Sequence, residues 1–119
     1  MDLAVKKCVP CEAGTPPMAK DEAKELLSQV SDWELVEEEG KLAIRKRFKF
    51  GTYLDGVEFI NRVAKIAEEE GHHPDIYLGW RRVTVNLMTH AIGGLSQNDF
   101  ILAAKIDNLQ RERERNRVK

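Results

Sequence analysis

The sequence is poor in the features that mark a secreted, membrane or nucleic-acid-binding protein. Its 119 residues include two cysteines and four prolines, and its 19 basic and 20 acidic residues leave a formal charge of −1. Such a balance excludes an overall field that would attract nucleic acid or an anionic membrane, so we expect a small or neutral partner. No apolar run approaches the roughly 20 residues of a membrane span, and residues 1–14 lack a signal-peptide stretch. The sequence predicts a soluble cytoplasmic protein with one compact core.

The two cysteines form a single CxxC pair, Cys8 and Cys11. Such a pair suits a redox centre, half of a zinc site, or neither. A structural zinc site usually takes four Cys or His ligands, and no second CxxC or HxxxH follows. A thioredoxin-like pair normally opens a helix, whereas AGTPP follows here. We therefore predict that residues 1–17 are mobile or loosely packed, with adventitious metal binding or a disulfide formed outside the cell as alternatives.

The rest of the chain changes between helical and strand periodicity. Apolar residues recur at helical spacing over about 18–30 and from Tyr53 to about Glu70, where Gly71 fits a C-cap. Two-residue alternation predicts one hairpin from Trp33 to Phe50, turning at Glu39-Gly40.

A second hairpin and a third helix complete the pattern. IYLGW at residues 76–80 and RRVTVNLMTH at 81–90 read as two strands, the second ending at His90. Ser96 and Asp99 then form an S-x-x-D capping box that opens the last helix.

The predicted order is α-β-β-α-β-β-α. Because hairpins pair antiparallel, we expect an α+β fold with one four-stranded antiparallel sheet and three helices packed on one face. The domain is assigned to residues 18–110, with Trp33 in its core. The charged tail at 111–119 favours a solvated helix end over an RNA-binding segment.

All three histidines lie between residues 72 and 90. His72 and His73 leave the second helix, and His90 ends the last strand. Antiparallel pairing places the start of one strand opposite the end of the other, so we expect His72 or His73 to face His90. Glu68, one turn before His72, is expected to orient or charge it.

Such a cluster can hold a metal or move protons. Adjacent histidines on a strand point to opposite faces, so both rarely bind one ion. Imidazole titrates at about pH 6.5, and a placed general acid or base is worth about 10²–10⁴ in rate. Ordinary surface histidines at element ends are the third interpretation of the same spacing.

Three spaced motifs make the pattern more specific. EEEGHHP at residues 68–74, Thr89-His90 and GGLSQND at 93–99 resemble the pterin-4a-carbinolamine dehydratase family. The similarity covers about residues 18–109. Asn98 and Ala91 depart from it, since animal members carry arginine at the first position and an acidic residue is common at the second.

This resemblance implies an activity. The protein is expected to remove water from 4a-hydroxytetrahydropterin, giving quinonoid dihydropterin for reuse by aromatic amino acid hydroxylases, with no metal and no organic cofactor. The family and the unpaired sheet edge both predict a homodimer or homotetramer. A non-catalytic protein-binding or coactivator module on the same fold, and a metal-binding domain using the CxxC pair, are the alternatives.

The resemblance also implies the site. His72, His73 and His90 form the catalytic set, with His72 and His90 as the acid and base and His73 chiefly binding substrate. Asp99 is explained equally well as part of the capping box. The remaining substrate contacts implied by the family are Glu68, Gly71, Met88, Thr89, Ala91 and Asp99.

Overall fold

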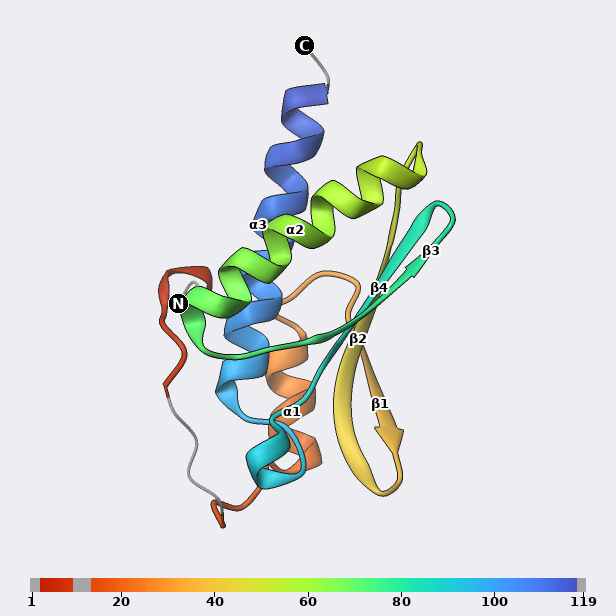
Figure 1. Cartoon of the computed structure of the whole chain (residues 1–119). Coiled ribbons are helices and arrows are strands. Elements are labelled where there is room, and N and C mark those ends of the chain that lie inside the picture. Colours follow the sequence, from red (N-terminus) through yellow and green to blue (C-terminus); the bar gives the residue numbers. More distant parts are fainter. Residues whose placement is uncertain (1–2, 10–13, 118–119) are drawn as a thin grey trace.

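A computed structural model describes residues 3–9 and 14–117. Its strands form one antiparallel sheet in the order β1-β2-β4-β3, and three α-helices cover one face of that sheet (Figure 1). This confirms the predicted class and order of elements. No helix in the described part of the chain is long and apolar enough to span a membrane. The elements are η1 (Leu3–Val5), α1 (Lys20–Leu27), β1 (Glu34–Glu38), β2 (Lys41–Lys49), α2 (Tyr53–Glu70), β3 (Asp75–Gly79), β4 (Arg82–Leu87), η2 (His90–Ile92) and α3 (Gln97–Arg117).

Both hairpins turn through two residues. Glu39 and Gly40 join β1 to β2 with φ of 52° and 79°, the left-handed conformations whose twist matches that of hairpin strands. Trp80 and Arg81 join β3 to β4. Because the strand order is β1-β2-β4-β3, β2 and β4 are the central strands and β3 is an edge strand.

The core lies between the sheet and the helices. The Phe48 and Phe59 ring centroids are 4.8 Å apart, and Trp33 meets Phe48 edge-on at 6.2 Å. The buried Trp33 indole N–H donates to the carboxylate of Asp107, 3.1 Å from each oxygen, and Lys46 binds the same carboxylate at 2.8 Å. The predicted core position of Trp33 is thus confirmed.

The first helix is shorter than predicted, spanning Lys20–Leu27 rather than about 18–30. At its start Ala19 has no side-chain acceptor for the free N–H groups of the first turn. At its end, the N–H groups of residues 28–30 donate to carbonyls three residues earlier. The chain therefore tightens into turns before β1.

The prediction that His90 ends the last strand is wrong. β4 stops at Leu87, and Thr89 pairs instead with Gly94 in an isolated bridge. On the neighbouring strand Pro74 has no N–H with which to lengthen the ladder. His90 therefore lies on the short turn η2, beyond the sheet.

The N-terminal residues 3–9 pack against α3, in contrast to the loose packing expected of residues 1–17. Leu3 is buried in the core, and the Lys105 ammonium donates to the Ala4 carbonyl at 2.8 Å. Cys8 is a free thiol, and Cys11 lies outside the described residues.

The predicted tail continues α3 without a break to Arg117. Within it, Arg113 pairs with Asp55 at 3.1 Å and lies 4.9 Å from the Phe50 ring centre. Arg113 thus ties the first turn of the tail to α2, while the domain boundaries at 17/18 and 110/111 stay predictions.

Candidate active site

A left-handed turn at the end of α2 sets the position of the histidine pair. Gly71 has φ of 66°, and the N–H of His72 donates to the Ala67 carbonyl at 3.1 Å. This arrangement closes the helix and favours glycine, which has no Cβ to strain. Pro74 then holds His73 toward an extended backbone. The two imidazoles consequently leave the chain in different directions.

His72 turns inward to a buried carboxylate. Its Nε2 lies 2.6 Å from Asp99 Oδ1, with side-chain exposures of 11% for His72 and 0% for Asp99. Asp99 Oδ2 also accepts the Thr89 hydroxyl at 2.9 Å and the Ser96 N–H at 3.0 Å. An ionised carboxylate only accepts hydrogen bonds, so this contact suits the His72 tautomer with its proton on Nε2. Asp99 therefore caps α3 and orients His72 at once.

His73 turns outward to Glu68. The His73 Nε2 and Glu68 Oε1 atoms are 2.8 Å apart, with side-chain exposures of 63% and 81%. The prediction that Glu68 orients His72 is wrong, because successive side chains of an extended segment point to opposite sides. The His-His doublet thus supplies one buried and one exposed imidazole.

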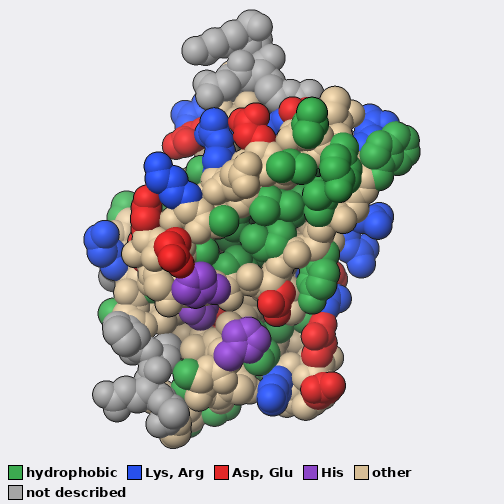
Figure 2. Space-filling view, in the orientation of Figure 1, with side chains coloured by type: hydrophobic (Ala, Val, Ile, Leu, Met, Phe, Trp, Pro, Cys, Tyr) green, Lys and Arg blue, Asp and Glu red, His purple; other side chains and the backbone are tan. Residues whose placement is uncertain are grey.

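One cavity of about 360 Å³ joins the three histidines. Figure 2 shows the histidine side chains gathered on one face of the molecule. His90 is exposed, and its imidazole has no hydrogen-bond partner within residues 3–9 and 14–117. The volume is in the range of small-molecule sites. The cavity is lined by Val9, Gly71, His72, His73, Met88, Thr89, His90, Ala91 and Asn98.

The cavity contains most of the residues implied by the family resemblance. Glu68 and Asp99 do not line it, and each contacts one of the histidines that do. The backbone N–H of Thr89 already has an acceptor within the protein, because it donates to the Gly94 carbonyl at 2.8 Å. Sequence reasoning missed Val9 and Asn98. Asn98 was visible only as a departure from the family pattern, and nothing in the sequence placed Val9 near residues so far along the chain.

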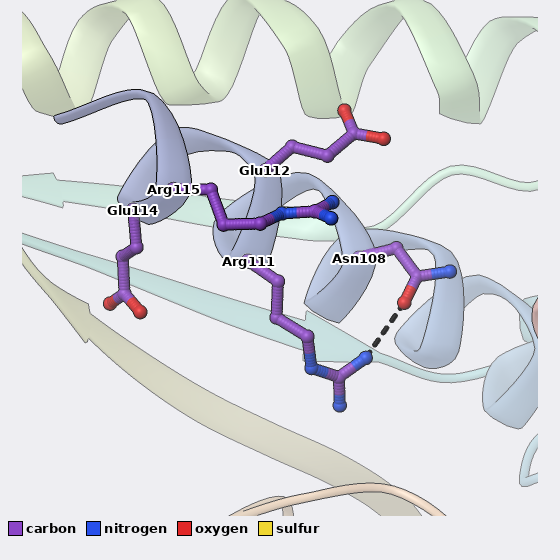
Figure 3. A pocket seen from close by; sticks show the side chains of 5 residues that line it. All are labelled: Asn108, Arg111, Glu112, Glu114 and Arg115. Atoms are coloured by element: carbon purple, nitrogen blue, oxygen red, sulfur yellow. Dashed lines mark hydrogen bonds between the residues drawn. The ribbon is translucent and has the colours of Figure 1, made fainter. Parts of the chain in front are cut away.

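A second, larger cavity of about 770 Å³ has a different character. It follows the exposed surface of α3 alone, and its side chains point outward from that one helix (Figure 3). No histidine contributes to it. It is lined by Asn108, Arg111, Glu112, Glu114 and Arg115.

The Cys8 thiol is protonated at neutral pH. Burial, and secondarily the Glu70 carboxylate, raise the pKa of Cys8 to about 12, so the thiolate that binds metals or attacks disulfides is scarce at neutral pH. Within the described ranges, no group of three or more His, Cys, Asp and Glu side chains is arranged to hold a metal ion.

The sequence profile described as pterin 4 alpha carbinolamine dehydratase matches residues 16–109. The chain belongs to this family. Pterin-4-alpha-carbinolamine dehydratase 2, mitochondrial, of Arabidopsis thaliana is 48% identical over 113 residues, which cover 93% of this chain and 60% of that protein. A Halorhodospira halophila protein named "Putative pterin-4-alpha-carbinolamine dehydratase" is 48% identical over 109 residues, covering 92% of this chain and 98% of that one.

The fold is also similar to that of a solved structure named as a pterin dehydratase. The transcriptional coactivator/pterin dehydratase from Brucella melitensis matches with a TM-score of 0.71 and 29% identity, covering 78% of this chain and 97% of that chain. The family predicted from the three motifs is therefore confirmed. Its match begins at residue 16, so the packed segment 3–9 lies outside the matched region.

Proposed function

We propose that this protein dehydrates 4a-hydroxytetrahydropterin to quinonoid dihydropterin and thereby recycles the pterin of aromatic amino acid hydroxylases. The observation that supports it best is the convergence of three imidazoles on one cavity, with His72 held by the buried Asp99 at 2.6 Å. Family membership supports the same substrate class. A cytoplasmic location is part of the proposal.

The reaction needs one acid and one base. The C4a–O bond breaks and the hydroxyl leaves as water with a proton from the acid, while the base removes the N5 proton and the N5–H electrons form the N5=C4a bond. His72 and His90 are the proposed pair, because they come from separate segments, the end of α2 and η2, and line one cavity. Solvent exchange then restores both imidazoles.

The remaining wall residues have binding roles in this proposal. His73, exposed and paired with Glu68, contacts the substrate at the rim. Gly71, Met88 and Ala91 form the wall against the flat ring. Thr89 supports Asp99 through its hydroxyl.

A direct assay tests this function. A phenylalanine hydroxylase reaction generates the carbinolamine, and the formation of quinonoid dihydropterin is followed with and without this protein. We expect rapid turnover by the wild type, and a kcat about 10²–10⁴ lower in His90→Ala with an unchanged circular dichroism spectrum. A wild type without turnover that still binds a defined partner would favour the coactivator module.

We also propose a homo-oligomer, most simply a dimer. β3 is an edge strand, and Figure 2 shows apolar side chains covering the surface beside the histidines. The exposed apolar residues include Leu54, Leu78 and Trp80. Leu78 packs closely against α2, because a Cβ added to Gly56 would lie 3.3 Å from Leu78 Cδ1. An exposed strand edge flanked by apolar surface favours pairing between copies.

Sedimentation equilibrium checks this assembly. Trp80→Glu places a charge in the apolar surface and is expected to lower the mass to that of a monomer. Val5→Glu, at an equally exposed valine on the N-terminal segment, is the control and keeps the wild-type mass. A monomeric wild type contradicts the proposal.

A further inference from the structure

Residues 3–9, here called the N-terminal arm, connect the core to the histidine cavity. At one end Leu3 is buried in the core, and at the other Val9 lines the same cavity as His72 and His90. The arm lies outside residues 16–109, which the family profile matches, and it adds a wall to a cavity whose other lining residues fall within that range.

Asn98 holds the end of the arm by two hydrogen bonds. The Val9 N–H donates to Asn98 Oδ1 at 3.0 Å, and Asn98 Nδ2 donates to the Val9 carbonyl. The Asn98 side chain is buried, and its own carbonyl lies 3.6 Å from the Cys8 thiol. Two bonds to one residue fix both position and orientation, as a neighbouring strand does. Since Asn98 precedes Asp99, one turn of α3 positions both the arm and His72.

A second anchor holds Cys8, the residue before Val9. The Cys8 N–H donates to Glu70 Oε1 at 2.8 Å, and Glu70 Oε2 lies 3.8 Å from the Lys105 ammonium, which in turn donates to Ala4. The helix dipole opposes a carboxylate at the C-terminus of α2. The hydrogen bond from the Cys8 N–H offsets this unfavourable interaction. The same hydrogen bond is the main cause of the lowered Glu70 pKa.

We infer that the N-terminal arm forms one wall of the pterin site, and that Asn98 is the positioning residue that sets this wall. The inference rests on the proposed function for the identity of the ligand. Val9 is 64% exposed, and its side chain offers apolar surface to a flat ring. Neither Val9 nor Asn98 titrates, so the arm acts on substrate binding and leaves proton transfer to the histidines.

A matched pair of variants tests the wall. Val9→Asp places a carboxylate in the cavity, whereas Val5→Asp makes the same change at a valine of the same arm that is 74% exposed and does not line the cavity. We expect Val9→Asp to raise the KM for the carbinolamine and the Kd for biopterin, measured by fluorescence quenching, by about tenfold. The kcat should change by less than about threefold, and Val5→Asp should match the wild type. Equal KM and Kd values in the two variants overturn the inference.

Asn98→Ala removes the anchor without adding charge. It should raise KM and the biopterin Kd by about threefold to tenfold, while Asn98→Asp, which keeps the acceptor for the Val9 N–H, should recover part of the loss. A KM that stays at the wild-type value in a folded Asn98→Ala variant contradicts the positioning role. If that variant does not fold, the two valine variants still decide the question.

A measurement without turnover separates this inference from the proposed function. The imidazole NMR signals of the three histidines should shift in Val9→Asp and keep their positions in Val5→Asp. Unchanged signals in both variants contradict the wall even if the wild type is an active dehydratase. If the signals shift in Val9→Asp but the wild type neither turns over carbinolamine nor binds biopterin, the arm still forms a wall of the cavity. The pterin is then rejected as its ligand.

Discussion

His72 and His73 are neighbours in the chain, yet each pairs with a carboxylate in a different environment. His72 meets Asp99 inside the protein, where the carboxylate has two further donors. His73 meets Glu68 at the surface, and both side chains are mostly in water. The N···O distances, 2.6 Å and 2.8 Å, are nearly the same.

The two pairs differ in their exposure to solvent and in the number of other hydrogen bonds that hold the carboxylate. An exposed ion pair is worth about 0–1 kcal/mol, because water and salt screen it and both side chains lose freedom. A buried hydrogen bond to a charged group is worth about 1.5–3 kcal/mol. The inner pair therefore holds its imidazole in one orientation, as a proton-transfer group requires, while the outer pair leaves His73 adaptable.

Alanine at each histidine tests this comparison most strongly. His72→Ala should lower kcat by about 10²–10⁴, because it removes the proposed proton-transfer group. His73→Ala should mainly raise KM, by less than about tenfold. Steady-state kinetics with circular dichroism as the folding check measures both, and equal losses of kcat would end the distinction between the pairs.

The carboxylates give the next largest effect. Asp99→Asn should lower the free energy of unfolding by about 1.5–3 kcal/mol and kcat by about 10–100-fold, because charged hydrogen bonds inside the protein are lost. The matched change Glu68→Gln at the surface should cost less than about 1 kcal/mol. Urea denaturation and kinetics check each value, and a Glu68→Gln variant as impaired as Asp99→Asn would contradict the argument from burial.

Thr89→Val sharpens the comparison, because it removes one hydrogen bond that holds Asp99 and leaves His72 and Asp99 unchanged. The variant loses the hydroxyl that donates to Asp99 Oδ2, and the free energy of unfolding should fall by about 1 kcal/mol. Thr84→Val on β4, away from the cavity, is the control and should show no loss of activity. A Thr89→Val variant with wild-type stability and kcat would mean that Asp99 holds His72 without this bond.

Glu70 extends the comparison to pH. It belongs to the same glutamate run as Glu68, but its side chain is only 9% exposed and its pKa is lowered below the usual 4.5, chiefly by the Cys8 N–H. A lowered folded pKa contributes stability that is present above 4.5 and lost as pH falls through the folded value. The stability advantage of wild type over Glu70→Gln should thus shrink on acidification, measured by urea denaturation from pH 7 to pH 3. An advantage independent of pH would contradict it.

Local chemistry predicted much of the fold. The bounds of α2 match the predicted Tyr53 to Glu70, since apolar periodicity and the Gly71 cap are both read within a few residues. The turn at Glu39-Gly40 is equally local. The end of β4 was not predictable, because Thr89 leaves the sheet to pair with Gly94 in a bridge that competes with the strand.

The site divides in the same way. The three histidines could be grouped from hairpin geometry, but the pairing of Glu68 was assigned to the wrong imidazole. The choice depends on a left-handed turn at Gly71 that directs two adjacent side chains apart. The contribution of Val9 depends on a contact 89 residues away in sequence, with Asn98.

The sequence by itself determined the family, the class of fold and the local devices that begin and end its elements, because periodicity, caps and turns act over neighbouring residues. Only the tertiary structure decided which imidazole turns inward, which carboxylate holds it and which distant residue lines the cavity. Those outcomes depend on how the end of α2, the start of α3 and the N-terminal arm pack together, and packing is a property of surfaces that meet from distant parts of the chain.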